Sequence, residues 1–243
     1  MLVDQEKCIG CGVCLPYCPA AAISIINEKA SINQEACLEC GNCLRNDVVP
    51  CPTEAFYEKA GIYEEPRSVG RFFSDPTTTH SVTKVPGRGT EEVKTNDVTG
   101  RVCRGEIGIA VELGRPCLGT TLIEVEKVTM ALASIGVCFE EANPLTQLMI
   151  DKQKGCMDPK YKNEKLVSAI IEFTAPLKEL EKILEKIKEI AQNIGTVFSL
   201  DLISCFEDDG SLPVLPLLQK MGIKPRVNSK VNLGLGRPYK INR

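Results

Sequence analysis

Regular alternation of hydrophobic and polar residues begins only after residue 106 of this chain. From there, alternation with a period of two predicts strands that are buried on one side, over residues 107–113, 167–173 and 198–202, and a further short strand is expected at 137–139. Hydrophobic residues at helical spacing predict two helices, over 121–135 and 176–194. The first helix opens with a capping box from Thr121 to Glu124, and the second opens on Pro176.

The order of these elements is β-α-β-β-α-β, which predicts two helices on one face of a four-stranded antiparallel sheet. We expect this domain to span residues 106–205. Residues 61–105 lack sustained periodicity and are rich in Thr, Ser, Gly and Pro, which favours an extended linker. Residues 206–243 are expected to form a C-terminal extension with a short helix around 215–221. From Lys220 onward this extension has seven basic residues and no acidic ones.

Residues 1–60 have a different organisation, because they hold eight of the 13 cysteines. The cysteines form two runs in which three are separated by two residues and the last precedes a proline: Cys8, Cys11, Cys14 and Cys18, then Cys37, Cys40, Cys43 and Cys51. The two runs belong to an internal repeat, since Asp4-Gln5-Glu6 lies before the first run as Asn33-Gln34-Glu35 lies before the second.

Cysteines at this spacing bind [4Fe–4S] clusters, and residues 1–60 resemble the bacterial-type ferredoxins that carry two such clusters. In that family, the fourth cysteine of each run binds the cluster of the other run. The resemblance implies two [4Fe–4S] clusters, the first held by Cys8, Cys11, Cys14 and Cys51, and the second by Cys37, Cys40, Cys43 and Cys18. The whole chain is therefore expected to be an α+β protein, with this module followed by the β-α-β-β-α-β domain.

A pair of zinc sites is the alternative, because C-x-x-C pairs also bind zinc. Zinc sites use two close pairs of ligands, and neither a third cysteine at the same interval nor the Cys-Pro ending serves them.

The second run departs from the ferredoxin pattern, since seven residues separate Cys43 from Cys51 where three separate Cys14 from Cys18. We expect the longer loop to lie beside the second cluster, where it would affect hydrogen bonding to sulfur and access of water.

Composition narrows the range of functions. The formal charge is −3, tryptophan is absent and aromatic residues make up 5% of the chain, so a nucleic-acid partner is not expected. The N-terminus lacks the pattern of a signal peptide, and no hydrophobic stretch approaches the ~20 residues that span a membrane, which predicts a cytoplasmic protein. His80 is the only histidine, in a polar stretch, so catalysis based on imidazole is not expected.

Three functions remain open. The first is an electron-transfer protein or subunit that relays single electrons to a partner oxidoreductase, while the second domain docks that partner. The second is a reductase that binds a substrate in its own C-terminal part, beside a cluster, with Arg88, Arg101 or Arg115 lining the pocket. The third is a redox-responsive regulator.

Four basic residues could form an anion site or simply face water, namely Arg88, Lys94, Arg101 and Arg104. The remaining cysteines match no metal motif and are expected to act as small buried residues, namely Cys103, Cys117, Cys138, Cys156 and Cys205. The sequence leaves the oligomeric state open.

Overall fold

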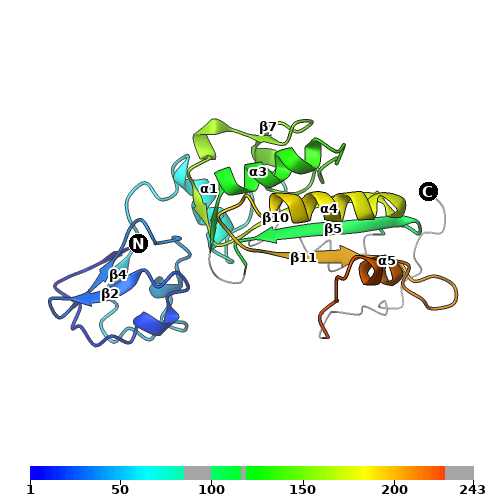
Figure 1. Cartoon of the computed structure of the whole chain (residues 1–243). Helices are drawn as coiled ribbons and strands as arrows, with labels where there is room; N and C mark the ends of the chain where they lie inside the picture. Colours follow the sequence, from blue (N-terminus) through cyan, green and yellow to red (C-terminus); the bar gives the residue numbers. More distant parts are fainter. Residues whose placement is uncertain (85–99, 116–118, 228–243) are drawn as a thin grey trace.

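The computed structural model describes residues 1–84, 100–115 and 119–227 and shows two regions side by side (Figure 1). The cysteine-rich N-terminal region lies at one end, and a sheet with its helices extends away from it. No helix among the described residues has the length and hydrophobicity needed to cross a membrane.

The N-terminal region is built from two short antiparallel strand pairs and two turns of 3-10 helix. Strand β1 (Leu2–Val3) pairs with β4 (Phe56–Tyr57), and β2 (Ile23–Ile26) pairs with β3 (Lys29–Ile32). The 3-10 turns lie within the cysteine runs, at η1 (Leu15–Tyr17) and η2 (Asn42–Leu44). The buried core is small and includes two of the cysteines, with Cys8, Cys14, Ala30, Val49 and Ala55. Such a core needs additional stabilisation, which bound metal supplies in many small domains.

The internal repeat read from the sequence is also present in the hydrogen bonds. The side chain of Asp4 accepts hydrogen bonds from the backbone amides of Glu6 and Lys7. The carbonyl of Asp4 accepts a hydrogen bond from Cys8 N at 3.0 Å. Asn33 makes the same bonds before the second run, and its carbonyl accepts from Cys37 N at 3.0 Å. The same turn therefore introduces both cysteine runs.

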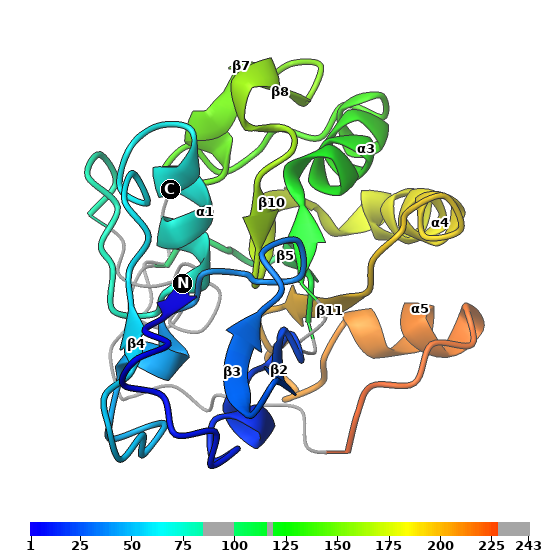
Figure 2. The ribbon, with the colours of Figure 1, turned by 90° about the vertical axis from the view of Figure 1, so that its left-hand side faces the viewer.

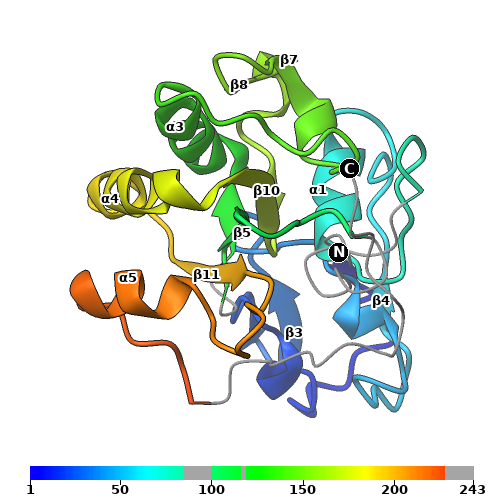
Figure 3. The same cartoon turned by 90° about the vertical axis from the view of Figure 1, so that its right-hand side faces the viewer.

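The C-terminal region contains a three-stranded antiparallel sheet in the order β10-β5-β11. Its central strand β5 (Glu106–Leu113) pairs with β10 (Ala169–Pro176) on one side and with β11 (Phe198–Ile203) on the other. Helices α3 (Leu122–Ala133) and α4 (Leu180–Ile190) cover one face, as Figures 2 and 3 show. Residues of β5 that alternate along the strand enter the main core with these helices, namely Ile107, Ile109, Val111 and Leu113.

The predicted fourth strand of this sheet is reduced to a single bridge. Phe139 pairs with Phe173, and Glu140 N then donates to Glu172 O at 2.8 Å. Directly afterwards, the side chain of Glu140 accepts a bond from Ala142 N, and the chain turns away from the sheet. The sequence prediction of four strands is therefore corrected to three among the described residues, while the order of the elements agrees with it.

Short elements complete the C-terminal region. Strand β6 (Thr120–Thr121) pairs with β9 (Lys165–Leu166), and β7 (Met149–Asp151) pairs with β8 (Cys156–Met157). The 3-10 turns are η4 (Thr146–Leu148), η5 (Pro159–Tyr161) and η6 (Leu177–Glu179). Helix α5 (Val214–Lys220) lies beyond β11, at the position where the sequence predicted a short helix. Most of the basic tail falls outside the described residues.

The segment predicted to be an extended linker contains a helix. Helix α1 (Arg67–Ser74) lies between the two regions (Figure 1). Phe73 is only 2% exposed and belongs to the core of the C-terminal region, while Arg71 is 5% exposed and faces the N-terminal region. The helix escaped the sequence analysis because it is only two turns long and buries arginine as well as phenylalanine. Residues 85–99 of the predicted linker lie outside the described part of the chain.

Candidate metal centres

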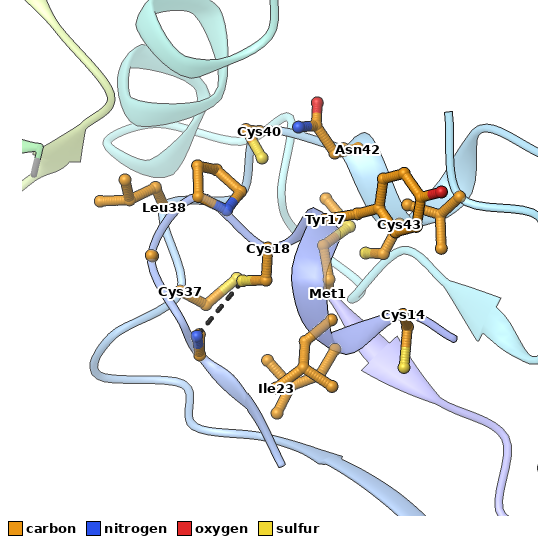
Figure 4. Close-up of a pocket in the computed structure, with 16 residues that line it drawn as sticks. Met1, Cys14, Tyr17, Cys18, Ile23, Cys37, Leu38, Cys40, Asn42 and Cys43 are labelled. Atoms are coloured by element: carbon orange, nitrogen blue, oxygen red, sulfur yellow. Dashed lines mark hydrogen bonds between the residues drawn. The ribbon is translucent and has the colours of Figure 1, made fainter. Parts of the chain in front are cut away.

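Two cavities described in the N-terminal region are lined by cysteines, and the larger of these, which we call the Cys37 cavity, has a volume of about 410 Å³ that is partly open to solvent. Four of the predicted ligands surround it, namely Cys18, Cys37, Cys40 and Cys43 (Figure 4). Cys18 comes from the first cysteine run and the other three come from the second. Cys14 also reaches the wall of this cavity, but in Figure 4 its sulfur points away from the other four. The remaining wall is mostly apolar, including Met1, Ile23, Leu38 and Val49.

The other cavity, the Cys8 cavity, encloses about 320 Å³ and is lined by Cys8, Cys11, Cys14 and Cys51. Here three cysteines of the first run meet the last cysteine of the second run. The two cavities thus bring together the two groups of four cysteines that the ferredoxin resemblance implied, including the exchange of Cys18 and Cys51. Cys14 lines both cavities and lies between them.

Glycines let the backbone of each run bend tightly around its cavity. Gly12 follows Cys11 and Gly41 follows Cys40, and both have φ of +74°, a left-handed conformation that suits glycine. Gly10 has a further constraint, since a Cβ there would lie 2.0 Å from Glu28 O. The first run therefore packs against the backbone of Glu28 more closely than a larger residue at position 10 would allow.

Backbone amides point at the cysteine sulfurs. Ala22 N donates to Cys18 Sγ at 3.2 Å, the contact drawn as a dashed line in Figure 4. On the other side of the module, Ala30 N donates to Cys8 Sγ at 3.3 Å. Bonds of this kind stabilise negative charge on sulfur, and so they favour the thiolate form that binds metal.

Burial has the opposite effect on several of these thiols. Burial, together with the neighbouring cysteines, raises the pKa of Cys43 to about 12. Burial likewise raises the pKa of Cys14 and of Cys40. At Cys51, burial works in the same direction, but backbone bonds from Ala55 and Thr53 outweigh it and lower the pKa. Four thiolates around one cavity therefore need a compensating positive charge, which bound iron would provide.

The donor set fits a cluster of iron and sulfur. Each cavity is lined by four or more cysteines in a mostly apolar wall, and sulfur is the donor that iron–sulfur clusters take from proteins. Within the described ranges, no three Cys, His, Asp or Glu side chains converge as ligands of one metal ion. A cluster requires a wider arrangement than a single ion, because each of its four thiolates binds a different iron.

The longer loop between Cys43 and Cys51 lies beside the Cys37 cavity. Val48 N and Val49 N both donate to Arg45 O, at 3.0 and 2.7 Å, which folds the extra residues into a compact turn. The turn places Val49, which is 1% exposed, in the cavity wall. The extra residues therefore add apolar cover beside this cavity.

The two cavities differ in their surroundings. Around the Cys8 cavity, Ile9, Val13 and Ile25 line the wall and are also exposed to solvent. Near the Cys37 cavity, Leu38 packs instead against the C-terminal region, where a Cβ on Gly119 would lie 2.9 Å from its Cδ2.

Three arginines that the sequence analysis did not select gather beside the Cys37 cavity. Arg45, Arg67 and Arg71 form ion pairs with acidic residues of both regions, including Glu39 and Asp75. The arginines that the sequence did select lie elsewhere: Arg101 pairs with Glu140, Arg104 with Asp208 and Arg115 with Glu112. Neither cavity has an arginine in its wall, and Arg88 and Lys94 lie outside the described residues.

His80 is engaged within its own loop. Its Nδ1 accepts a bond from Thr83 N at 3.1 Å, and its ring lies 5.0 Å from that of Phe72. Burial, with a smaller contribution from Lys84, lowers the pKa of His80. These contacts give the ring a structural role in this loop.

Comparison with known proteins agrees with the geometry of the N-terminal region. Residues 1–46 match the family described as a 4Fe-4S dicluster domain. The match includes seven of the eight cysteines and ends before Cys51. No curated protein and no solved structure matches the chain. The match supports an iron–sulfur, ferredoxin-like N-terminal region with 4Fe–4S binding, of the kind that serves electron transfer in general.

Proposed function

We propose that this chain relays single electrons through two [4Fe–4S] clusters to or from a partner oxidoreductase. Cys8, Cys11, Cys14 and Cys51 would hold the first cluster, and Cys37, Cys40, Cys43 and Cys18 the second. The observation that carries the proposal is that each cavity is lined by all four cysteines proposed for one cluster, with Cys14 lining both cavities. We further propose that the chain works in the cytoplasm, because thiols are kept reduced there.

Each cluster, when bound, accepts or gives one electron at a time. The residues of the chain adjust this chemistry in three ways. Backbone amides such as Ala22 N and Ala30 N stabilise negative charge on sulfur. Apolar residues such as Val49 and Leu38 limit the access of water to the Cys37 cavity. Cys14 lies between the cavities, which keeps the path from one cluster to the other short.

The partner would approach from the side of the Cys8 cavity. This side is open and apolar, with Cys11 exposed and Ile9 62% exposed. The Cys37 cavity lies instead toward helix α1 and the C-terminal region. Because residues 1–60 carry eight acidic and four basic side chains, we expect a partner with a basic rim around an apolar surface.

A reductase with its own substrate site is the second candidate. It requires a pocket next to a cluster, lined by Arg88, Arg101 or Arg115. Arg101 and Arg115 are instead engaged by Glu140 and Glu112 and line neither cavity, which favours the relay. A redox-responsive regulator, the third candidate, has no specific structural feature in its favour.

Metal analysis combined with two cysteine variants tests the proposal. The protein purified without oxygen should contain about eight irons and eight acid-labile sulfides. Cys18→Ser should impair the second cluster and Cys51→Ser the first, each with loss of up to half of the iron. Electron paramagnetic resonance of the reduced protein should lose a different signal in each variant. Stoichiometric zinc without labile sulfide would refute the cluster assignment, and loss of the same signal in both variants would refute the exchange of ligands.

The relay itself is tested by turnover. The reduced protein alone should not convert small-molecule substrates through repeated cycles, whereas a cell fraction that contains the partner should reoxidise it. Repeated turnover by the isolated protein would refute the relay and support the reductase.

A further inference from the structure

Helix α1 contacts the loop that carries three of the second cluster's proposed ligands. Arg71 Nη1 donates to Glu39 O at 2.7 Å, and Glu39 lies between Cys37 and Cys40. The guanidinium also covers Gly41, where a Cβ would lie 2.6 Å from Nη1. The side chain of Arg71 thus touches the loop backbone at two points.

The other contacts of Arg71 fix its direction. Its Nη2 lies 2.9 Å from Glu58 Oε1 and 2.8 Å from Asp75 Oδ2, and Asp75 also pairs with Arg45 of the N-terminal region. With its side chain only 6% exposed, the guanidinium has little room to adopt another position. The planar guanidinium donates to several partners in fixed directions, so it holds the loop backbone and helix α1 in one relative position. A lysine ammonium, a single charge on a flexible side chain, would not do so.

Arg67, one turn earlier in α1, extends the connection into the C-terminal region. Its Nη2 lies 2.6 Å from Glu39 Oε1, and its Nη1 lies 2.7 Å from Glu164 Oε2. The C-terminal end of α1 is anchored as well, because Val167 N donates to Ser74 Oγ at 3.1 Å. The loop of the Cys37 cavity, helix α1 and the β9–β10 connection therefore form one continuous set of contacts.

This set of contacts is incompletely satisfied. Within the described part of the chain, Glu39 Oε2 and Arg71 Nε are buried without a hydrogen-bond partner, and so is Ser168 Oγ in the β9–β10 connection. Buried polar atoms without partners cost free energy. These atoms lower the stability of the docked arrangement, and holding loop 37–43 in place from its other side would offset part of that cost.

From this geometry we infer that binding of the second cluster and docking of the C-terminal region are linked, with Arg71 as the positioning residue that links them. The inference rests on the proposed ligands of the second cluster. A cluster that fixes loop 37–43 presents Glu39 O and Gly41 to Arg71, and so favours the docked state of α1. By reciprocity, docked α1 must favour the bound cluster to the same extent. Within the described part of the chain, none of these contacts of Arg71 reaches a residue that lines the Cys8 cavity, so loss of the first cluster should leave α1 docked.

Hydrogen exchange in two matched cluster variants tests the first half of the linkage. Cys43→Ser should remove the second cluster and Cys11→Ser the first, with iron content and paramagnetic signals checked in each variant. Exchange of the amides of 61–75 should accelerate about tenfold in Cys43→Ser, within the usual range of coupling between sites, and should stay unchanged in Cys11→Ser. Equal exchange in both variants would overturn the linkage, whereas a failure to lose distinct clusters would instead refute the proposed ligands.

Arg71 variants test the reciprocal half. Arg71→Met should lower the occupancy or shift the reduction potential of the second cluster and leave the first unchanged. Arg71→Lys should rescue little of this loss, because the effect depends on geometry. Arg104→Met is the control, since Arg104 pairs with Asp208 beyond the far end of β5. Unchanged potential and occupancy of the second cluster in Arg71→Met would overturn the role of Arg71.

Discussion

Gly41 and Arg71 fit together so closely that no side chain can stand between them: a Cβ on Gly41 would lie 2.6 Å from Nη1 and 3.0 Å from Nη2 of Arg71. Gly12 occupies the equivalent position in the first cysteine run, with the same φ of +74°, but a Cβ there would meet only Leu15 Cδ1 at 3.7 Å. The repeat thus offers two glycines with the same left-handed backbone conformation and different surroundings.

This pair yields the first prediction. Gly12→Ala should cost about 1–2 kcal/mol of stability from backbone strain alone. Gly41→Ala should cost about 3 kcal/mol or more, because it also displaces a buried, paired arginine. Anaerobic denaturant unfolding measures both values, with cluster content checked before each titration. Equal losses in the two variants would show that Arg71 moves aside without cost.

The second prediction concerns acid. Burial alone would raise the pKa of Asp75, but bonds from Thr77 and the charges of Arg71 and Arg45 outweigh it and lower the pKa. A lowered pKa in the folded state means that Asp75 contributes stability above its unfolded pKa of about 3.9. That contribution is lost as the pH falls through the lower, folded pKa.

Asp75→Asn should therefore be less stable than the parent protein at pH 7, and the difference should shrink as the pH falls below about 4. Thermal unfolding of both proteins across this range gives the measurement. Iron content is measured in both proteins at each pH, so that loss of a cluster is separated from loss of the Asp75 contribution. A difference that is independent of pH would contradict the assigned role of Asp75.

The sequence predicted the parts of the molecule whose structure is determined by contacts within a short or repeated stretch of residues. The spacing of Cys8, Cys11 and Cys14 specifies a turn around a cluster, and alternation over 107–113 specifies β5, so both were predicted from short stretches. Contacts that join distant stretches left no such pattern. Arg71 meets Glu39 across 32 residues, and Arg67 meets Glu164 across 97. Neither contact produces a periodic pattern of hydrophobic residues in the sequence. For this reason the segment that contains helix α1 was predicted to be a linker.

The position of α1 changes where the C-terminal region is expected to begin. A fragment of residues 100–243 would follow the boundary drawn from the sequence, but it lacks Phe73, which lies in the core of that region. Loss of a buried phenylalanine side chain costs about 3–5 kcal/mol. A fragment of residues 61–243 retains Phe73 and the contacts of Ser74 and Arg67.

We expect fragment 61–243 to fold without iron and to unfold cooperatively, and fragment 100–243 to be less stable by several kcal/mol, as judged from circular dichroism in denaturant. The variant Phe73→Ala in the longer fragment separates the effect of this side chain from that of chain length. Equal stability of the two fragments would restore the boundary at residue 106. Failure of both to fold would show that the two regions form a single unit.

Two cysteines outside the cavities lie close together. Cys205 Sγ donates to Val102 O at 3.2 Å, and the Cα of the next residue, Cys103, lies about 2.8 Å from that oxygen by standard peptide geometry. Burial and then the neighbouring Cys103 raise the pKa of Cys205. Both side chains are partly exposed, contrary to the expectation of small buried residues.

Oxidised glutathione, applied without oxygen, should therefore link Cys103 to Cys205 and release two molecules of reduced glutathione. Because the pKa of Cys205 is raised, the reaction should be faster at pH 9 than at pH 7. Mass spectrometry of peptides after alkylation of free thiols identifies the link, and Cys138, which is exposed, serves as the internal control. Glutathione attached separately to Cys103 and Cys205 would show that the two sulfurs do not meet.

The last prediction concerns the surface where the partner docks. Ile9 lies in the wall of the Cys8 cavity and is 62% exposed, and Ile150 of strand β7 is 65% exposed on the C-terminal region. The two residues are equal in type and exposure, so they differ mainly in their distance from the proposed first cluster. A charge at Ile9 would disrupt an apolar contact with the partner at the proposed docking surface beside the Cys8 cavity, whereas a charge at Ile150 would simply face water.

Ile9→Lys should slow reoxidation of the reduced protein by a cell fraction that contains the partner about tenfold, equivalent to about 1.4 kcal/mol. Ile150→Lys should leave this rate unchanged, and a small-molecule oxidant should reoxidise both variants at the parent rate. Rising salt should slow the protein-mediated reaction, because exposed charges are screened over about 10 Å at 0.1 M. An equal effect of the two lysines, or a rate independent of salt, would move the docking surface away from the Cys8 cavity.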